Sequence, residues 1–208
     1  MSFGRRRGYS DCIRGVRARN VLTASTFAVT IGRPLNVAVD INWSKTSADD
    51  DMHGHLLAAW RKRAGRFLQR RGAGGLTCTW ARERPTHPVP RPNAHLNCYV
   101  PIRLFGAFVK NAHRFLPIGC SALDPEAIYI QMIGSTGDDY RRRTEYLVKA
   151  AHPKARLPIQ RKRNSQGRIY GKRCGTSEDI GLAARIRADE AARETSSPQT
   201  AASHKAGY

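Results

Sequence analysis

Apolar and polar residues alternate along residues 35–43, and this is the first clear structural signal in the chain. The segment reads Leu-Asn-Val-Ala-Val-Asp-Ile-Asn-Trp, and a period of two predicts a half-buried β-strand. Residues 1–34 are rich in arginine, serine and threonine and lack a strong apolar period. They predict a basic amino-terminal arm that contacts phosphates, so the folded part is expected to begin at residue 35.

Helical and strand patterns then follow one another up to residue 151. Apolar residues recur three and four positions apart in the helical segments, whereas the strand segments are rich in β-branched and aromatic residues. The glycines at 72, 74 and 75 and the prolines from 85 to 92 separate the segments. The predicted elements after the first strand are helix 56–68, strand 76–81, strand 94–102, helix 104–115, strand 127–133 and helix 138–151.

The resulting order, β-α-β-β-α-β-α, predicts the fold class. It favours an α+β fold with a small antiparallel sheet and helices packed on one face, in the ferredoxin-like (RRM-like) manner. We expect this domain to span residues 35–152. A basic carboxyl-terminal extension with a short helix is predicted for residues 153–194, and a disordered polar tail for residues 195–208.

The charge of the chain indicates its partner. Lysine and arginine number 36 against 16 acidic residues, which gives a formal net charge of +20, and such a protein is expected to bind a polyanion. A bias toward arginine codons would explain arginine over lysine but not the shortage of acids. The candidate nucleic-acid-binding residues are Arg61, Lys62, Arg63, Arg141, Arg142, Arg143, Arg161, Lys162, Arg163, Lys172 and Arg173.

Cysteine content and hydropathy exclude several other classes. The five cysteines are odd in number and form no C-x-x-C pair, so we expect reduced thiols rather than a disulfide framework or a structural zinc site. No apolar run approaches the roughly 18 residues that span a bilayer, and the amino terminus lacks the apolar core of a signal peptide. The expectation is a cytoplasmic protein without membrane contact.

A pair of polar residues on the strand 94–102 suggests a metal site. His95 and Asn97 are two apart, so their side chains share one face of the strand. An imidazole nitrogen and an amide oxygen can bind one divalent cation, here Mg²⁺ or Mn²⁺. Glu83, at the end of the preceding strand, is the expected third ligand, and His87 is a weaker candidate. Taken alone, the pair is more often an ordinary set of polar groups.

The last predicted helix carries a candidate nucleophile. Tyr146 and Lys149 are three apart and share a helix face. A phenol with a pKa of about 10 needs a base or a nearby positive charge to react at neutral pH, and Lys149 and the metal are expected to supply it. In the competing interpretation Tyr146 is a core residue and Lys149 lies in solvent.

Taken in order, these residues resemble a known family. The strand around residues 36–43, Glu83, the His95-Leu96-Asn97 segment and the Tyr146-Leu147-Val148-Lys149 segment are similar to the HUH endonucleases with one catalytic tyrosine, the rolling-circle replication initiators of bacterial plasmids and phages. The similarity covers about residues 35–151, and residues 167–173 add to it. Asn97 stands where the family usually has a second histidine.

The resemblance implies a specific function. Glu83, His95 and Asn97 would hold the metal, Tyr146 would be the nucleophile and Lys149 its helper. The protein would nick and rejoin single-stranded origin DNA through a 5′-phosphotyrosine intermediate, as a metal-dependent endonuclease and strand transferase. The chain lacks a complete G-x-x-x-x-G-K-[ST] motif, so the expected further partners are a host helicase and polymerase.

Two other functions fit parts of the sequence. A non-catalytic protein that binds single-stranded DNA or RNA would explain the charge and the departure at Asn97, although the sheet lacks the aromatic stripe of such modules. A basic protein that packages nucleic acid would explain the charge alone. It leaves the pairings of His95 with Asn97 and of Tyr146 with Lys149 unexplained.

Overall fold

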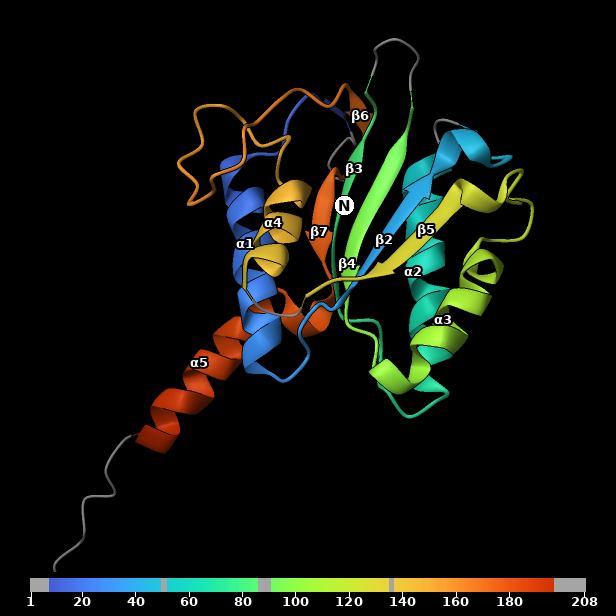
Figure 1. The fold of residues 1–208 in the computed structure, drawn as a ribbon. Helices are drawn as coiled ribbons and strands as arrows, with labels where there is room; N and C mark the ends of the chain where they lie inside the picture. The colour runs from blue at the N-terminus through green and yellow to red at the C-terminus, as the bar shows by residue number, and fades with distance from the viewer. Residues whose placement is uncertain (1–7, 50–51, 86–90, 135–136, 197–208) are drawn as a thin grey trace, which may run out of the picture.

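A five-stranded antiparallel sheet forms the centre of the computed structural model, which describes residues 8–49, 52–85, 91–134 and 137–196. The strand order is β5-β2-β4-β3-β7, and helices lie on both sides (Figure 1). The α+β class with an antiparallel sheet is therefore as predicted. The strands are β2 (Val37–Asn42), β3 (Cys78–Glu83), β4 (Asn93–Cys98), β5 (Ile128–Met132) and β7 (Cys174–Thr176).

The helices do not all share one face of the sheet, and this corrects the sequence prediction. In Figure 1, α2 and α3 cover one face, α1 and α4 cover the other, and α5 projects away from the body. The sequence prediction lacked α1, and α1 and α4 together bury the second face. The α-helices of the described residues are α1 (Gly15–Thr30), α2 (His53–Gln69), α3 (Phe105–Asn111), α4 (Gly137–Leu147) and α5 (Leu182–Ser196).

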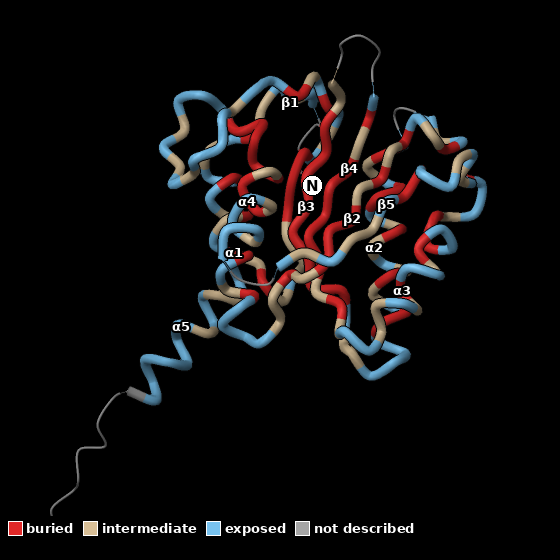
Figure 2. The backbone as a smooth tube through the Cα atoms, in the orientation of Figure 1, coloured by how far each residue is buried: buried red, intermediate tan, exposed pale blue. Residues whose placement is uncertain are grey.

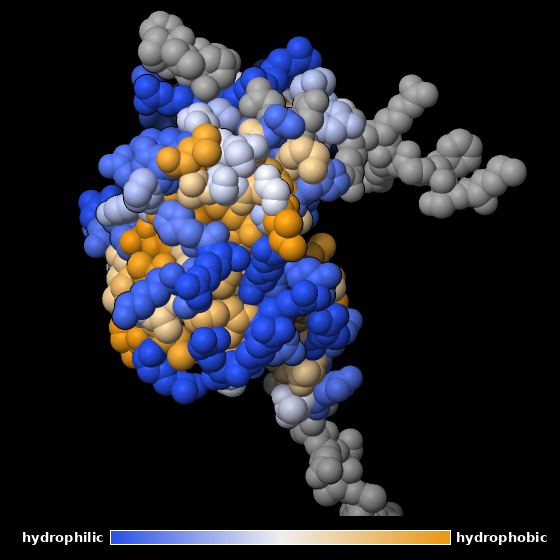
Figure 3. All heavy atoms as spheres, turned by 90° about the vertical axis from the view of Figure 1, so that its right-hand side faces the viewer, coloured by the Kyte–Doolittle hydropathy of each residue, from blue (hydrophilic) through white to orange (hydrophobic). Residues whose placement is uncertain are grey.

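The larger apolar core lies between the sheet and the α2/α3 side. Val37, Val39 and Ile41 of β2 point into it because they share one strand face. The Trp60 ring of α2 meets Phe108 of α3 edge to face, with ring centroids 6.1 Å apart. Figure 2 shows buried residues running along the strands of the sheet. The outer surface of this side, seen in Figure 3, mixes hydrophilic side chains with smaller hydrophobic patches.

The opposite face of the sheet has a smaller core built from small side chains. Ala18 and Val21 of α1 pack with Leu147, at the end of α4, and with Ala81 of β3. Alanine at these positions lets the helix approach the sheet closely. Less apolar surface is available on this face, which leaves room for polar side chains between the sheet and α4.

Residues 15–30 are a buried helix and not part of an arm, which corrects the prediction for residues 1–34. The buried residues Ala18, Val21, Ala24 and Ala28 recur at helical spacing along α1. Three of the four are alanines, whose small side chains give a weak apolar period. Residues 1–7, which include the first arginine cluster, lie outside the described residues.

The carboxyl-terminal segment also belongs to the fold. β7 pairs with β3 and forms one edge of the sheet. Residues 169–170 form β6 (Ile169–Tyr170), which pairs with β1 (Tyr9–Ser10) near the beginning of the chain. The predicted extension 153–194 is therefore integrated into the domain, although its helix is present as α5. Of the predicted tail, residues 197–208 lie outside the described residues.

Short 3-10 helices complete the described elements and refine two predicted boundaries. The helix predicted for residues 138–151 ends at Leu147, so Lys149 lies in the turn that follows. The helix predicted for residues 104–115 consists of α3 and two flanking 3-10 helices. The 3-10 helices are η1 (Trp43–Lys45), η3 (Ile102–Leu104), η4 (Ala112–Phe115), η5 (Pro125–Ala127) and η6 (Glu178–Ile180).

Two further observations concern the chemical class of the chain. All five cysteines are free, and four of them are buried, as expected for reduced thiols. Among the helices that the structure describes, each is too short or too polar to cross a lipid bilayer.

The packing of α1 predicts a contrast between two of its valines. Val21 is fully buried, whereas Val16 is 72% exposed on the same helix. Val21→Ala should lower the free energy of unfolding by about 2 kcal/mol because it opens a cavity, and Val16→Ala should change it by less than about 0.5 kcal/mol. Chemical denaturation measures both values. Equal, small effects would mean that residues 15–30 are an unpacked arm after all.

Candidate active site

Three polar side chains from neighbouring strands meet on the sheet face that α1 and α4 cover. The strand register places Asp40 of β2 directly opposite His95 of β4. On the other side of β4, His95 is opposite Ala81 of β3, and Glu83 lies two residues further along β3. Because residues two apart on a strand share a face, Asp40, His95 and Glu83 form a row across three strands.

The His95 ring joins two carboxylates. Its Nδ1 lies 2.5 Å from Oδ1 of Asp40, and its Nε2 lies 2.5 Å from Oε1 of Glu83. Lys149 extends the row, because its Nζ lies 2.8 Å from Oε2 and 3.1 Å from Oε1 of Glu83. His95, Glu83 and Lys149 are all buried. The four side chains thus alternate between acid and base.

The pKa shifts in this row follow from burial and pairing. Burial alone would lower the pKa of His95, but the hydrogen bonds to Asp40 and Glu83 and their charges outweigh it, and the pKa is raised. Burial alone would raise the pKa of Glu83, but His95 and Lys149 reverse the shift and lower it. Burial lowers the pKa of Lys149 against the opposing effect of Glu83. These pairings favour the charged forms of all four groups, with the carboxylates of Asp40 and Glu83 facing the cations of His95 and Lys149.

Tyr146, on the last turn of α4, packs against this row. Its ring meets the His95 ring edge to face, with centroids 4.9 Å apart. The Nζ of Lys149 lies 3.5 Å from the centroid of the tyrosine ring, and the guanidinium carbon of Arg161 lies 4.8 Å from it. The predicted proximity of Tyr146 and Lys149 is therefore present, although a turn and not the helix places Lys149 there.

The electrostatic surroundings of the phenol differ from the sequence expectation. Burial raises the pKa of Tyr146, and the carboxylates of Glu83 and Asp40 raise it further. The positive charges that oppose this rise are those of Arg161 and Arg143. In the described arrangement, these arginines favour the phenolate, whereas Lys149 is engaged by Glu83.

The chain beyond α4 returns to the tyrosine and is fixed there. The buried carboxylate of Glu145 accepts hydrogen bonds through Oε2 from the backbone N–H groups of Gln160 and Arg161, at 3.2 and 3.0 Å. The N–H of Asn164 donates to the carbonyl of Lys149 at 3.1 Å. Arg161 therefore lies beside Tyr146 because of backbone contacts on both sides of it.

Asn97 lies further along the same face of β4. It is opposite Ala38 of β2 and Thr79 of β3, two residues along each strand from the row of Asp40, His95 and Ala81. Its side chain is buried, and its amide nitrogen has no hydrogen-bond partner among the described residues. It shares the sheet face with His95, as predicted, but no hydrogen bond between described residues joins it to Glu83 or His95.

The side-chain atoms near His95 were compared with the ligands that a metal ion requires. Across the described part of the chain, no group of three or more histidine, cysteine, aspartate and glutamate side chains is arranged to hold a metal ion. Two donors do converge, Nε2 of His95 and Oε1 of Glu83. An imidazole and a carboxylate are donors that suit Mn²⁺ and similar ions. The alternative ligand His87 lies outside the described residues.

The structure thus brings together four of the sequence-predicted residues, Glu83, His95, Tyr146 and Lys149. Sequence reasoning missed Asp40, which contacts His95 directly. A signal for it exists, because Asp40 occupies a polar position in the alternating segment of the first predicted strand. Recognising it requires knowledge that β2 pairs with β4 in this register.

The predicted nucleic-acid-binding residues differ in their exposure. Arg141, Arg142, Arg161 and Lys162 are exposed on or after α4, on the same side of the sheet as Tyr146. Arg173 is only 1% exposed, and its guanidinium donates to the carbonyls of residues 10, 166 and 167. The prediction is corrected for Arg173, which stabilises the fold and is not available to a nucleic acid.

Several other predicted contacts are directed into the protein. Arg163 donates to three backbone carbonyls of residues 152–155, and Arg63 donates to the carbonyl of Leu116. Arg61 and Lys172 lie over the ring of Trp80. Trp80 is itself buried in the core, which excludes it as a stacking platform for bases.

Comparisons with known proteins identify no relative of this chain. No protein-family model, no curated protein and no solved structure matches the chain.

The buried pairing of Glu83 predicts a large cost for its removal. Glu83→Gln should lower the free energy of unfolding by about 3 kcal/mol, because the buried charges of His95 and Lys149 lose their common partner. Denaturation with urea measures this loss. Adding Lys149→Met to Glu83→Gln should recover part of it, since the unpaired ammonium is removed.

A matched control is available on the surface. Glu126 is 80% exposed and pairs with Lys45, and Glu126→Gln should leave stability almost unchanged because exposed pairs contribute little. An unchanged or higher stability of the Glu83→Gln variant would contradict the pairing described here.

Proposed function

We propose that this protein is a metal-assisted tyrosine endonuclease that nicks and rejoins single-stranded DNA, of the HUH replication-initiator type. One observation carries the proposal: the Tyr146 ring packs 4.9 Å from the His95 ring, whose Nε2 meets Glu83. A partly exposed tyrosine beside an imidazole–carboxylate pair is the combination that such chemistry needs. The formal net charge of +20 supports a nucleic-acid substrate.

The topology supports the same assignment. Between Val37 and Leu147 the elements run β2-α2-β3-β4-α3-β5-α4, and the four strands are ordered β5-β2-β4-β3 in the sheet. We assign these elements to the ferredoxin-like topology, with α2 and α3 as its two connecting helices. The candidate site then lies on the face that these two helices leave uncovered, where α1 and α4 are additions.

The proposed divalent cation would take the place of the proton that now joins Glu83 to Nε2 of His95. Glu83 and Nε2 of His95 would hold it, and Mg²⁺ or Mn²⁺ in such sites is completed by water and substrate phosphate oxygens. Asp40 would orient the ring, because its carboxylate accepts the Nδ1–H and leaves Nε2 directed at Glu83. Asn97 would be a ligand only if its side chain moved toward His95.

Such a cation supplies charge stabilisation at the scissile phosphate. The chain's own residues do the rest. The phenolic oxygen of Tyr146 forms a bond to phosphorus, and the bond between phosphorus and the 3′-oxygen breaks. The phenol loses its proton when it attacks, and the departing 3′-oxygen gains one, so the number of protons is conserved. The products are a 5′-phosphotyrosine and a free 3′-hydroxyl, and attack by that hydroxyl reverses the reaction and rejoins the strand.

The cations near Tyr146 have separate roles in this scheme. The backbone N–H of Arg161 is held by the carboxylate of Glu145. The Arg161 guanidinium favours the phenolate form of Tyr146 and would stabilise the negative charge of the phosphate that the phenolate attacks. Lys149 balances Glu83 and lies over the tyrosine ring. A replication initiator with this chemistry would act on origin DNA together with a host helicase and polymerase.

A second candidate function is a non-catalytic protein that binds single-stranded nucleic acid. It is favoured by the row of side chains itself, since both nitrogens of His95 are engaged by carboxylates. Such a closed network can serve stability alone. In that case Tyr146 would be a packing residue and no covalent product would form.

Formation of a covalent adduct tests the proposed reaction. The protein incubated with a pool of single-stranded oligonucleotides and Mn²⁺ should give a protein–DNA adduct that survives denaturing electrophoresis, and Tyr146→Phe should abolish it. Tyr140 provides a matched control on the same helix, because its hydroxyl donates to the carbonyl of Ser25 at 2.6 Å and burial raises its pKa to about 12.

Tyr140→Phe should therefore retain the adduct. An adduct that persists in Tyr146→Phe would move the nucleophile elsewhere. The absence of any adduct, together with retained oligonucleotide binding, would favour the non-catalytic function.

Metal binding gives a readout that does not depend on activity. Mn²⁺ binding, followed by electron paramagnetic resonance, should be lost in Glu83→Gln and weakened about tenfold in Asp40→Asn, because a misdirected imidazole is a poorer ligand. Glu126→Gln should bind Mn²⁺ like the unmodified protein. Unchanged affinity in Asp40→Asn would contradict its orienting role, and lost affinity in Asn97→Ala would make Asn97 a ligand.

A further inference from the structure

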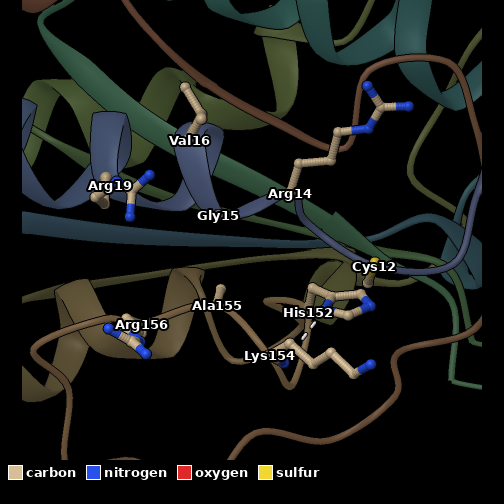
Figure 4. Close-up of a pocket in the computed structure, with 9 residues that line it drawn as sticks. All are labelled: Cys12, Arg14, Gly15, Val16, Arg19, His152, Lys154, Ala155 and Arg156. Carbon is tan, nitrogen blue, oxygen red and sulfur yellow. Dashed lines mark hydrogen bonds between the residues drawn. The ribbon is translucent and has the colours of Figure 1, made fainter.

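An open groove with basic walls lies between the beginning of α1 and the loop that follows α4. Its volume is about 490 Å³. Figure 4 shows Arg14 and Arg19 on the α1 side and His152, Lys154 and Arg156 on the loop side. All five side chains are exposed. None of the residues that line the groove is acidic, so its electrostatic character is uniformly positive or neutral.

Backbone pairing holds the two walls together. The N–H of Ile13 donates to the carbonyl of Ala150 at 2.8 Å, and the N–H of His152 donates to the carbonyl of Ile13 at 2.9 Å. A β-carbon added at Gly15 would lie 3.1 Å from the β-carbon of Ala155, which is a tight contact. Glycine at this position therefore allows the start of α1 to approach the loop closely.

Three backbone carbonyls of the loop already accept hydrogen bonds from within the protein. The Arg163 guanidinium donates to the carbonyls of His152, Pro153 and Ala155, at 2.9, 2.9 and 2.6 Å. The backbone N–H of Lys154 donates to Nδ1 of His152 at 3.2 Å, the dashed line in Figure 4. A neutral His152 ring then carries its proton on Nε2, which leaves a donor for an anionic ligand.

The nearest acid in sequence does not neutralise this surface. Asp11 is exposed and pairs with Arg168 at 3.3 Å. The first turn of α1 contains no acidic residue, and no side chain caps it. The groove therefore keeps its positive charges available to a ligand, and the amino end of α1 adds to them.

Along the sequence, the groove residues follow the candidate active site closely. Lys149, which lies over the Tyr146 ring, is three residues before His152. The segment that places Arg161 beside Tyr146 also places Arg163 beneath the loop. A chain of phosphates that reaches Tyr146 can therefore follow this segment into the groove.

We propose that this groove binds the phosphodiester backbone of the DNA strand next to the scissile phosphate. The inference rests on the proposed function for the position of the strand, and on the groove itself for the chemistry of recognition. Exposed arginine and lysine side chains without acids contact phosphates independently of base sequence. The groove therefore contributes affinity and positions the strand, while Tyr146 performs the reaction.

Oligonucleotide binding with matched charge changes tests this proposal. The variant Tyr146→Phe is used throughout, so that no covalent product forms. In this background, Arg14→Gln/Arg19→Gln/Arg156→Gln should weaken binding of a 30-nucleotide oligothymidylate about tenfold at physiological salt. The slope of log affinity against log salt should fall by about 2, since about 0.7 is lost for each phosphate contact on a single strand.

The control removes the same charge from the opposite side of the molecule. Arg66, Arg70 and Arg114 are exposed and line a second basic groove on the α2/α3 side, the side turned to the viewer in Figure 3. Arg66→Gln/Arg70→Gln/Arg114→Gln should leave the salt slope almost unchanged. Thermal unfolding of both triple variants should match that of the parent, because all six side chains are exposed.

Equal losses in the two triple variants would overturn the proposal, because net charge alone would then explain binding. No loss in the first triple variant would also overturn it. The two proposals fail separately. An adduct from the unmodified protein without a specific effect of the groove variant refutes only the groove. A specific effect of the groove variant without any adduct refutes the nuclease, and with it the position of the groove beside a scissile phosphate, but leaves the groove as a phosphate-binding site.

Discussion

An imidazole ring with a carboxylate at each nitrogen, buried against a sheet, must be surrounded by groups that balance its charges. Asp40 and Glu83 supply two negative charges, and Lys149 supplies a second positive one beside Glu83. Each of these contacts depends on another element being in place. The register of β2, β4 and β3 aligns the row, and the turn after α4 delivers the ammonium. Tyr146 is positioned because it packs on the ring that this network immobilises.

Because side chains alternate along each strand, the main apolar core and the charged row lie on opposite faces of the sheet. One face carries valine, isoleucine and tryptophan against α2 and α3, and it forms most of the apolar core. The other face carries the charged row, and it is closed by small residues of α1 together with Leu147 of α4 and the residues that follow it. A change such as a longer side chain at Ala18 would therefore disturb the polar face without entering the main core. This arrangement lets the polar face vary while the main core stays intact.

Much of the fold was predictable from the chain because its patterns are local. The period of two in β2 and the helical period of α2 can be read in the sequence, and so can the candidates His95, Glu83 and Tyr146. What could not be predicted depends on contacts between distant segments. The role of Asp40 follows from strand pairing, and burial of Arg173 follows from carbonyls that converge only in the fold. The helix α1 was missed because its buried face is mostly alanine, which gives a weak apolar signal.

Arg163 occupies three backbone carbonyls in the loop after α4 and so fixes the shape of that loop in the absence of any ligand. A loop that is already ordered loses little conformational entropy when a partner arrives. For the proposed DNA strand, association would then require no slow rearrangement of this loop, and electrostatically guided diffusion would set its rate. An arginine that never touches the strand would thus determine how quickly the strand is captured.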